Sequence, residues 1–388
     1  MRLSGRHLLV GICGGIAAYK IPGFIRRLIK EGAAVQTVVT QNGARFVGSA
    51  ALSTITKRPV VSDLFPENSS ITTEHISASD WADALIIAPA TANTISKCAN
   101  GIADDFLSTL YLSLKTPVIF APAMNTVMWD HEAVQHNIDI LKKRGHTIIE
   151  PADGELACGT CGKGRLPEED ILLYETIRVL TPQTLKGKRV VITAGGTEEA
   201  IDPVRVITNR SSGKMGTALA IEAWLRGADV TLIHASMSSA IPSFIPSVAA
   251  KSAAAMKDAL RSAFSSTDIL IMAAAVSDFT PLKVATTKIK KSGAAPVIEL
   301  TETADILKSL APLKAKQKIV GFALEDTDAV ARATEKMKTK GCDLLVLNGP
   351  SALGAETSEI SILKPDGSVK ALGMLSKEKS AAAIIDSI

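Results

Sequence analysis

The chain has 388 residues, which favours two or three domains of about 150 residues each. Apolar residues make up 46% and charged residues 21%, which is typical of a globular protein and excludes a disordered or fibrous chain. Lysine and arginine (43) exceed aspartate and glutamate (39) by 43 − 39 = 4, which is too few for nucleic acid as the main partner but suits phosphorylated small molecules.

The cysteines and the N-terminus indicate a cytoplasmic protein. Five irregularly spaced cysteines do not form a disulfide framework, so a reducing compartment is expected. Leu8–Ala18 is apolar and follows the basic segment Met1–Arg6, which imitates a signal peptide, but a glycine pair at Gly14 and Gly15 interrupts it. No stretch approaches the ~18 apolar residues of a membrane span, so we expect no membrane partner.

The first half begins with a predicted strand–helix–strand unit. Residues 8–12 form an apolar run that ends at the glycine pair, and residues 16–30 carry apolar side chains at helical spacing. Glu31 and Gly32 end that helix, and residues 34–39 form the second strand. Further strands are predicted at 84–88, 117–120 and 147–149.

Small and polar residues follow four of these strands. They are Gly14 and Gly15, then Thr40, then Thr91 and Asn93, and finally Asn125. Ligands in open α/β sheets lie beyond the carboxyl ends of the strands. Any one of these segments could be only a tight turn, but four together favour a cofactor. The glycine spacing is not G-x-G-x-x-G and no acid follows the second strand, which favours FMN over NAD.

Three further residues carry reactive groups. His75 follows a polar loop, where a lone histidine is more often a surface or capping residue than a catalyst. Cys158 lies in a glycine-rich loop suited to a lid. Cys158 and Cys161 form a C-x-x-C pair that is compatible with redox chemistry or half a zinc site, but no second ligand pair is evident, so zinc is not expected.

Four motifs in order resemble one family: Gly11–Lys20, Ala88–Asn93, Pro122–Trp129 and Ala157–Gly159. These resemble the homo-oligomeric flavin-containing Cys decarboxylases, among them the phosphopantothenoylcysteine decarboxylases. The resemblance implies a flavodoxin-like fold in which FMN oxidises the cysteinyl β-carbon, and the resulting thiocarbonyl accepts electrons as the carboxylate leaves. It implies His75 as the base, Asn125 as the carboxylate ligand and Cys158 as the proton donor. The implied FMN contacts are Gly14, Gly15, Ile16, Thr40, Thr91 and Asn93.

A second glycine turn marks a domain boundary. A short helix is predicted up to about residue 179, and Thr181–Leu185 breaks its pattern. Gly187–Thr197 then repeats the phrase of Gly5–Gly15, an apolar strand that ends in a glycine pair. We therefore expect two tandem Rossmann-like three-layer α/β domains, residues 1–181 and 182–388.

The second half repeats the α/β pattern. A helix is predicted to begin at 211–216, where Lys214 and the free N–H groups favour an anion, although the spacing excludes a Walker loop. Strands are predicted at 229–234, 268–272, 319–322 and 344–347, a hairpin at 359–363 with 368–372, and helices at 328–340 and 376–385. Asp278 follows one strand and could meet a metal or a ribose, and Lys288 belongs to a lysine run that is either solvated or faces a triphosphate.

The motifs at Asp202–Arg205, Asn209, Ser211–Gly216, Ala273–Phe279 and Lys288–Lys290 resemble the phosphopantothenate–cysteine ligases. With both halves matched, the chain is similar to the bacterial bifunctional coenzyme A biosynthesis proteins. The resemblance implies a ribokinase- or Rossmann-like ligase domain that uses CTP and Mg²⁺ to form an acyl-cytidylate, which cysteine displaces. Asn209 would hold the acyl phosphate anhydride, Arg205 would assist its breakdown and Lys288 would stabilise charge. The implied CTP contacts are Ala273, Ala274, Ala275, Asp278, Lys288, Ala304, Asp305, Ile306, Leu307, Phe322, Lys336 and Lys340, with Asp278 at the metal.

Two other functions fit parts of the pattern. A non-catalytic regulator with a flavoprotein fold would be favoured by the loss of His75, Asn125 or Cys158, but all three are present. A tandem NAD(P) oxidoreductase would not bind a yellow flavin tightly. From the resemblance we expect decarboxylase trimers and ligase dimers, combined in a dodecamer. Gly349-Pro350 after Asn348 departs from the family pattern, and the preference for CTP over ATP stays open.

Overall fold

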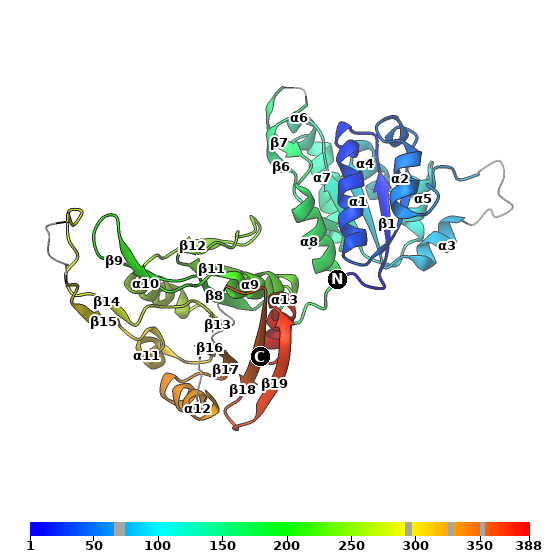
Figure 1. The fold of residues 1–388 in the computed structure, drawn as a ribbon. Coiled ribbons are helices and arrows are strands. Elements are labelled where there is room, and N and C mark those ends of the chain that lie inside the picture. The colour runs from blue at the N-terminus through cyan, green and yellow to red at the C-terminus, as the bar shows by residue number, and fades with distance from the viewer. Residues whose placement is uncertain (66–73, 158, 292–296, 325–328, 350–353) are drawn as a thin grey trace. The chain divides into compact units, whose positions relative to one another are not determined.

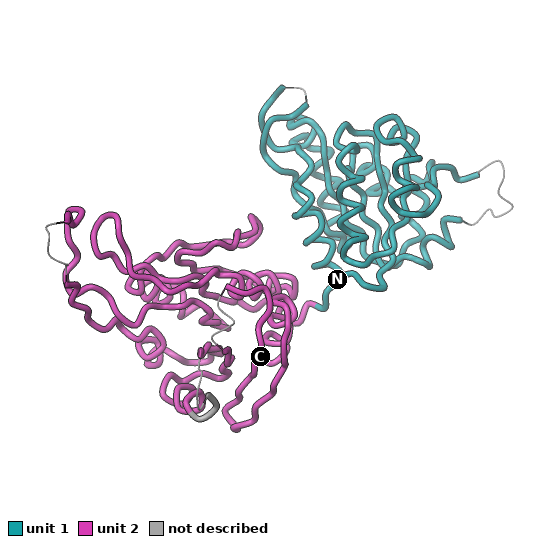
Figure 2. Tube along the Cα trace, viewed as in Figure 1, with its two compact units in different colours: residues 1–182 teal, residues 183–388 magenta. Residues whose placement is uncertain are grey.

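The structure is a computed structural model that describes residues 1–65, 74–157, 159–291, 297–324, 329–349 and 354–388, without the side chains of 329–331. The chain divides into two compact units, Met1–Pro182 and Gln183–Ile388 (Figure 2). Each unit is described by itself.

The first unit, drawn from blue to green in Figure 1, is built on a parallel sheet. This sheet has five strands in the order β2-β1-β3-β4-β5. Its strands are β1 (His7–Ile12), β2 (Ala34–Val39), β3 (Ala84–Ala90), β4 (Val118–Pro122) and β5 (Thr147–Ile148). Strands β3 and β4 are buried along their whole length, because helices cover both faces of the sheet. The order is that of flavodoxin-like sheets, which confirms the predicted fold of this half.

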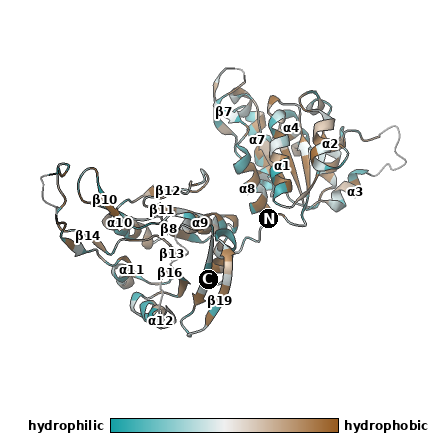
Figure 3. Ribbon diagram, viewed as in Figure 1, coloured by the Kyte–Doolittle hydropathy of each residue, from teal (hydrophilic) through white to brown (hydrophobic). Residues whose placement is uncertain are grey.

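Two groups of helices cover the two faces of this sheet. One group contains α1 (Ile21–Lys30), α2 (Ser49–Thr56) and α8 (Glu169–Leu180), and the other contains α3 (Glu74–Trp81), α4 (Ala92–Asn100), α5 (Phe106–Ser113) and α7 (Glu132–Lys143). In α1 the buried residues Ile21, Phe24, Ile25 and Leu28 lie at the spacing of one helix stripe. The helices of this unit carry both hydrophilic and hydrophobic segments (Figure 3). The single helix predicted over 16–30 is divided into a 3₁₀ turn, η1 (Ile16–Lys20), and α1, because Pro22 lacks an N–H and suits a helix start.

Smaller elements complete the first unit. They are η2 (Gly43–Arg45), α6 (Thr126–Trp129) and the antiparallel hairpin β6 (Ala152–Glu155) with β7 (Cys161–Arg165). The hairpin was not predicted, since its sequence is rich in glycine and lacks apolar alternation.

The second unit contains an eight-stranded sheet in the order β12-β11-β8-β13-β16-β17-β18-β19. The parallel strands are β8 (Arg189–Ala194), β11 (Asp229–His234), β12 (Ser247–Ala249), β13 (Ile269–Met272), β16 (Lys318–Leu324) and β17 (Leu344–Asn348). The predicted hairpin, β18 (Thr357–Leu363) with β19 (Val369–Ser376), continues the sheet in the antiparallel sense. The six parallel strands follow the Rossmann order 3-2-1-4-5-6, which confirms the predicted fold of this half.

Helices also cover both faces of the second sheet. Helices α9 (Lys214–Leu225) and α13 (Lys377–Asp386) pack against each other. The opposite core includes side chains from α10 (Ala253–Phe264), α11 (Ile306–Leu310) and α12 (Ala329–Lys340), while η3 (Ala311–Leu313) follows α11. Two ribbons were not predicted, β9 (Glu198–Ala200) with β10 (Val206–Thr208) and β14 (Phe279–Pro281) with β15 (Leu300–Glu302).

Among the helices of the described ranges, none combines the length and the apolar character that crossing a membrane would require.

Candidate functional sites

The first unit has a cavity of about 990 Å³ at the carboxyl ends of β1, β3 and β4. Strand order reverses between β1 and β3, which is the position where open α/β sheets bind ligands. The structure brings together here all the residues for which the sequence implied an FMN contact, and also Asn125. The FMN set is Gly14, Gly15, Ile16, Thr40, Thr91 and Asn93.

Gly14 gives this cavity part of its shape. A Cβ on Gly14 would lie 2.4 Å from the Cβ of Asn42, a contact too short for any side chain. The Thr40 hydroxyl donates to the Ile12 carbonyl (3.3 Å) and accepts from the Gly43 N–H (3.1 Å), which fixes the turn that carries Asn42. The turns after β1 and β2 therefore lie close together and leave the cavity open above them.

The N-terminus of α4 also lies at the cavity. Thr91 caps this helix by accepting a hydrogen bond from the Thr94 N–H (3.4 Å), and Ala92 and Asn93 of the first turn line the cavity. A helix N-terminus carries partial positive charge and unpaired N–H groups, which suit a phosphate.

A charged cluster lines the cavity beside α4. The Lys97 ammonium lies 2.6 Å from an Asp104 oxygen and 2.7 Å from an Asp105 oxygen. Burial raises the pKa of Asp105, but hydrogen bonds from Lys97 and Ser108 outweigh it and leave that pKa below its ordinary value. Asp105 also caps α5 in a capping box with Ser108, so one carboxylate joins α4 to α5.

Asn125, which also lines the cavity, caps α6. Its side-chain oxygen accepts a hydrogen bond from the Val127 N–H (2.9 Å). The β6–β7 hairpin lies against this segment: the Met124 N–H donates to the Gly164 carbonyl (2.9 Å), and a Cβ on Gly164 would meet the Met124 carbonyl oxygen. This contact brings Arg165 to the cavity.

Of the other two predicted catalytic residues of this half, the structure describes only His75. His75 lies in the first turn of α3 and does not line this cavity. Cys158 lies outside the described residues, although its neighbour Ala157 lines the cavity. Cys161 is an exposed free thiol at the start of β7.

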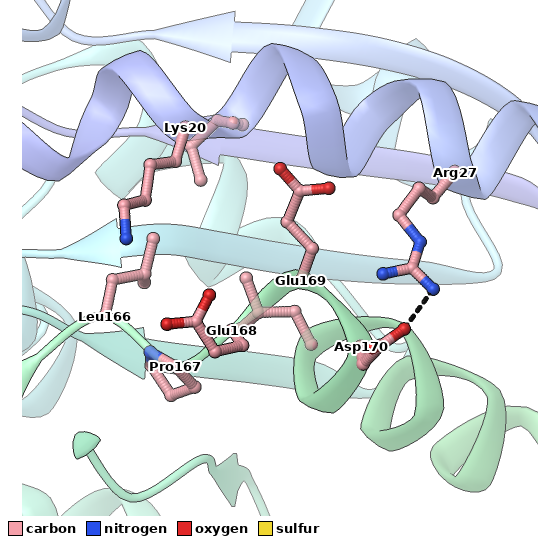
Figure 4. A pocket seen from close by; sticks show the side chains of 9 residues that line it. Lys20, Arg27, Leu166, Pro167, Glu168, Glu169 and Asp170 are labelled. Carbon is pink, nitrogen blue, oxygen red and sulfur yellow. Dashed lines mark hydrogen bonds and ion pairs between the residues drawn. The ribbon is translucent and has the colours of Figure 1, made fainter. Parts of the chain in front are cut away.

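A smaller cavity of about 310 Å³ lies between α1 and the start of α8 (Figure 4). Lys20 and Leu166 line both this cavity and the larger one. Glu168 and Glu169 give the smaller cavity an acidic wall, and an ion pair between Arg27 and Asp170 joins its two sides. These charges tie α8 to α1 and indicate a structural role.

The second unit has a cavity of about 860 Å³ at its own switch point, between β8 and β13. Here the structure brings together Asn209 and every residue implied for CTP except Lys288. The set is Ala273, Ala274, Ala275, Asp278, Ala304, Asp305, Ile306, Leu307, Phe322, Lys336 and Lys340.

The N-terminus of α9 forms one wall of this second cavity. Gly213 adopts φ = 76°, which a residue with a side chain rarely adopts. A Cβ on Gly216 would lie 2.5 Å from the Cβ of Ala194, so α9 packs directly on β8. Both glycines line the cavity at the N-terminus of α9, a position that suits the anion expected from the sequence.

Charged side chains surround this cavity. Lys340 pairs with Asp305 (3.1 Å), and Asp305 caps α11 by accepting from the Lys308 N–H (3.1 Å). Burial raises the pKa of Asp305, but the Lys308 N–H and Lys340 outweigh it and hold that pKa below its ordinary value. Lys377 also lines the cavity and was missed by sequence reasoning. Burial, and secondarily the charge of Lys214, lowers the pKa of Lys377.

Asn209 and Arg205 occupy different places. The Asn209 side-chain amide donates to the carbonyls of Ala275 and Val276 (both 3.2 Å), which holds it on the cavity wall. Arg205 and Lys288 are not part of that wall. Instead, Arg205 Nη1 donates to Asp202 Oδ2 (2.7 Å) and to the carbonyl of Ile289 (3.1 Å), next to Lys288.

In the part of the chain that the structure describes, no three His, Cys, Asp or Glu side chains group as metal ligands. Asp278, the residue implied for the metal, is exposed on the wall of the second cavity. Mg²⁺ commonly takes one or two carboxylates together with substrate phosphates, so Asp278 fits a metal that arrives with a nucleotide.

Known proteins match the chain along its whole length. Residues 1–181 match the Flavoprotein family, and residues 185–388 match the DNA/pantothenate metabolism flavoprotein C-terminal domain. The coenzyme A biosynthesis bifunctional protein CoaBC of Bacillus subtilis is 43% identical over 397 residues, which cover 100% of this chain and 97% of that protein. A cysteine/cysteine sulfinic acid decarboxylase from an unknown prokaryotic organism is 44% identical and covers 87% of this chain and 97% of its own. A crystal structure of a CoaBC C-terminal domain is 37% identical, covers 52% of this chain and 94% of its own, and has a TM-score of 0.46.

Proposed function

Because the chain belongs to the family of bifunctional coenzyme A biosynthesis proteins, with a decarboxylase and a ligase activity, we propose how its two halves divide these activities. Residues 1–181 form an FMN-dependent phosphopantothenoylcysteine decarboxylase. Residues 182–388 form a CTP-dependent phosphopantothenate–cysteine ligase. The ligase joins cysteine to 4′-phosphopantothenate, and the decarboxylase converts the product to 4′-phosphopantetheine.

The observation that carries this proposal is that the implied FMN set converges on the first cavity and the implied CTP set, except Lys288, converges on the second. In the first cavity, Gly14, Gly15 and the start of α4 suit a phosphate, and the Gly14–Asn42 contact leaves a cradle that a Cβ would fill. Bound FMN supplies reversible oxidation of the cysteinyl carbon. Thr40 and Asn93 supply the polar contacts that orient it.

In the first half, three side chains bind the substrate carboxylate and transfer protons. Asn125 binds the substrate carboxylate with its amide while its oxygen caps α6. His75 takes the proton from the substrate. Cys158 returns a proton to the product, and a thiol with an ordinary pKa of ~8.5 is suited to that step.

The side chains of the second half activate a carboxylate and transfer it. Lys288 stabilises the charge that develops as the acyl-cytidylate forms, and Asp278 contacts the Mg²⁺ that accompanies CTP. Asn209 holds the acyl phosphate anhydride. Arg205 assists its breakdown by cysteine, and the lysines of the second cavity hold the nucleotide.

Self-association would complete both sites. His75, Arg205 and Lys288 lie outside the cavity walls of their own unit, so a second copy can supply them. Exposed apolar side chains on and beside the ribbons of the second unit support this: Val204, Val206, Phe279, Leu282 and Leu300. We propose decarboxylase trimers and ligase dimers in a cytoplasmic dodecamer. Light scattering on the eluted protein should give about twelve times the mass of one chain. The mass of a monomer would contradict this assembly.

One incubation tests both activities. The purified protein receives 4′-phosphopantothenate, cysteine, Mg²⁺ and CTP, and the products are identified by mass. Formation of 4′-phosphopantetheine supports both assignments, while accumulation of 4′-phosphopantothenoylcysteine supports the ligase alone. No consumption of 4′-phosphopantothenate would overturn the ligase assignment. Decarboxylation of free cysteine in a parallel tube without 4′-phosphopantothenate would instead favour the activity named for the second relative.

A further inference from the structure

We propose that Asp202 is a positioning residue that couples Arg205 to the segment carrying Lys288, so that both half-reactions of the ligase depend on one buried carboxylate. This inference rests on the proposed function, which gives Arg205 and Lys288 their roles. No motif-based role falls on Asp202 itself.

The two oxygens of Asp202 have different partners. Oδ1 accepts from the backbone N–H groups of Val204 and Arg205, both at 2.8 Å, and so closes its own turn. Oδ2 accepts from the Arg205 guanidinium (2.7 Å) and from the Ile289 N–H (3.1 Å), 87 residues away. Arg205 Nη1 also donates to the Ile289 carbonyl (3.1 Å), so both polar backbone groups of Ile289 are held.

The environment keeps this carboxylate charged. The Asp202 side chain is fully buried, whereas the Arg205 side chain is 47% exposed. Burial raises the pKa of Asp202, but the N–H groups of Val204, Ile289 and Arg205 and the Arg205 charge outweigh it, so that pKa lies below its ordinary value. Losing any one of the four donors would leave this buried carboxylate partly unpaired, which costs free energy. The four donors therefore hold the carboxylate in one arrangement.

The segment around Lys288 needs this support. Residues 282–291, all of them described, belong to no helix or strand. Ile289 is fixed through Asp202 and Arg205, and the Ala285 N–H donates to the Ile201 carbonyl (3.0 Å) close by. The turn with Arg205 and the segment with Lys288 therefore move as one body, and a shift of about 1 Å at either residue can cost 100-fold in rate.

The variant Asp202→Asn should break the side-chain contacts with Arg205 and Ile289 while it keeps the hydrogen bonds of the turn. The Asn oxygen can still accept from Val204 and Arg205, but its NH₂ group then faces two donors, the Arg205 guanidinium and the Ile289 N–H. Asp268→Asn is the matched control, because Asp268 also accepts a backbone N–H, from Arg189 (2.9 Å), and does not line the cavity.

Limited trypsin digestion tests the coupling without any activity. The full-length protein is digested under native conditions, and mass spectrometry measures cleavage after Lys288. Asp202→Asn should speed this cleavage by about tenfold or more, while Asp268→Asn leaves it within twofold of wild type. Equal cleavage in wild type and Asp202→Asn would overturn the coupling, whatever the enzyme does.

Separate measurements of the two ligase half-reactions, activation and transfer, test the consequence of this coupling. Pyrophosphate release with 4′-phosphopantothenate, Mg²⁺ and CTP reports activation, and CMP release after cysteine is added reports transfer. Asp202→Asn should slow both by about tenfold or more, whereas Arg205→Gln slows transfer and Lys288→Gln slows activation. Adding Asp202→Asn to Arg205→Gln should leave transfer unchanged within twofold but still slow activation.

The outcomes distinguish the two proposals. If wild type releases no pyrophosphate, the ligase assignment fails, while the trypsin result still decides the coupling. If Asp202→Asn slows only one half-reaction, or if the double variant loses transfer additively, Asp202 does not couple the two residues. Equal melting temperatures of Asp202→Asn and Asp268→Asn would exclude general unfolding as the cause.

Discussion

Gly14 and Asn42 approach so closely that a Cβ on Gly14 would lie 2.4 Å from the Cβ of Asn42, at the wall of the first cavity. Gly14→Ala should therefore push the two turns apart and weaken FMN binding by about tenfold, because overpacking costs about 1–3 kcal/mol. Flavin absorbance of the purified protein and a fluorescence titration with FMN measure the effect. Gly48→Ala is the control, since its added Cβ meets open space at φ = −74°. Equal flavin content in both variants would contradict the prediction.

Asn125→Asp should abolish decarboxylation and spare the fold. The new carboxylate still accepts from the Val127 N–H and caps α6, but it repels the substrate carboxylate. We expect a loss of about 100-fold or more in decarboxylase turnover, the usual scale for one lost electrostatic contact. Mass spectrometry should then show 4′-phosphopantothenoylcysteine accumulating at the wild-type ligase rate. Retained 4′-phosphopantetheine formation would remove Asn125 from the site.

The pair of Lys97 with Asp105 should make the first unit sensitive to acid. The pKa of Asp105 is lowered in the folded state, so its stabilisation is present above the unfolded value of about 3.9 and is lost as pH falls through the folded value. Asp105→Asn keeps a good cap but removes the charge, and should cost about 1 kcal/mol at pH 7.

Thermal unfolding of that variant should lose part of its pH dependence below about pH 4. Asp104→Asn is the comparison, because it removes the other carboxylate that pairs with Lys97, a carboxylate that is more exposed and caps no helix that the structure describes. Parallel melting curves of wild type and Asp105→Asn against pH would count against the ion pair as an acid-sensitive tie.

Lys377 should contribute a charge to nucleotide binding. It lines the second cavity and donates to the Ser358 hydroxyl (3.1 Å). Lys377→Gln should weaken CTP binding about three- to tenfold at pH 7, which is about 1 kcal/mol for one charge in a partly exposed site. Lys379→Gln, an exposed lysine of the same helix that is absent from the cavity lining, should leave affinity within twofold.

The lowered pKa of Lys377 adds a pH signature. The ammonium loses its proton at a lower pH than an ordinary lysine, so CTP affinity should start to fall below the usual lysine value of about 10.4 as pH rises. Isothermal titration at several pH values would show this fall in wild type. The same fall in Lys377→Gln would assign it to another group.

Strand ends such as Thr40 and Asn125 could be placed from the sequence, because parallel strands share one carboxyl edge. Asp202 and Lys377 could not. Asp202 acts on Ile289, 87 residues away, and no local pattern announces that contact. Lys377 reaches the second cavity because it follows β19 at the antiparallel end of the sheet, and only the complete strand order places it there.

The short ribbons were missed for a different reason. Each strand of β9–β10 and β14–β15 has three residues, too few for apolar alternation to be distinguished from a loop. Their apolar side chains, such as Val206 and Phe279, are exposed and so obey no core pattern. Sequence periodicity indicates which side chains are buried in the fold of a single chain. These apolar side chains are exposed in the single chain, so periodicity does not reveal them.

Each unit has its own sheet and its own core, yet one polypeptide contains both. Every round of translation therefore yields one ligase and one decarboxylase together. Gene dosage and promoter strength can change the amount of the pair but not the ratio within it. The balance between the two activities is then set by the kinetics of each half, and a mutation that disables one of them would change it.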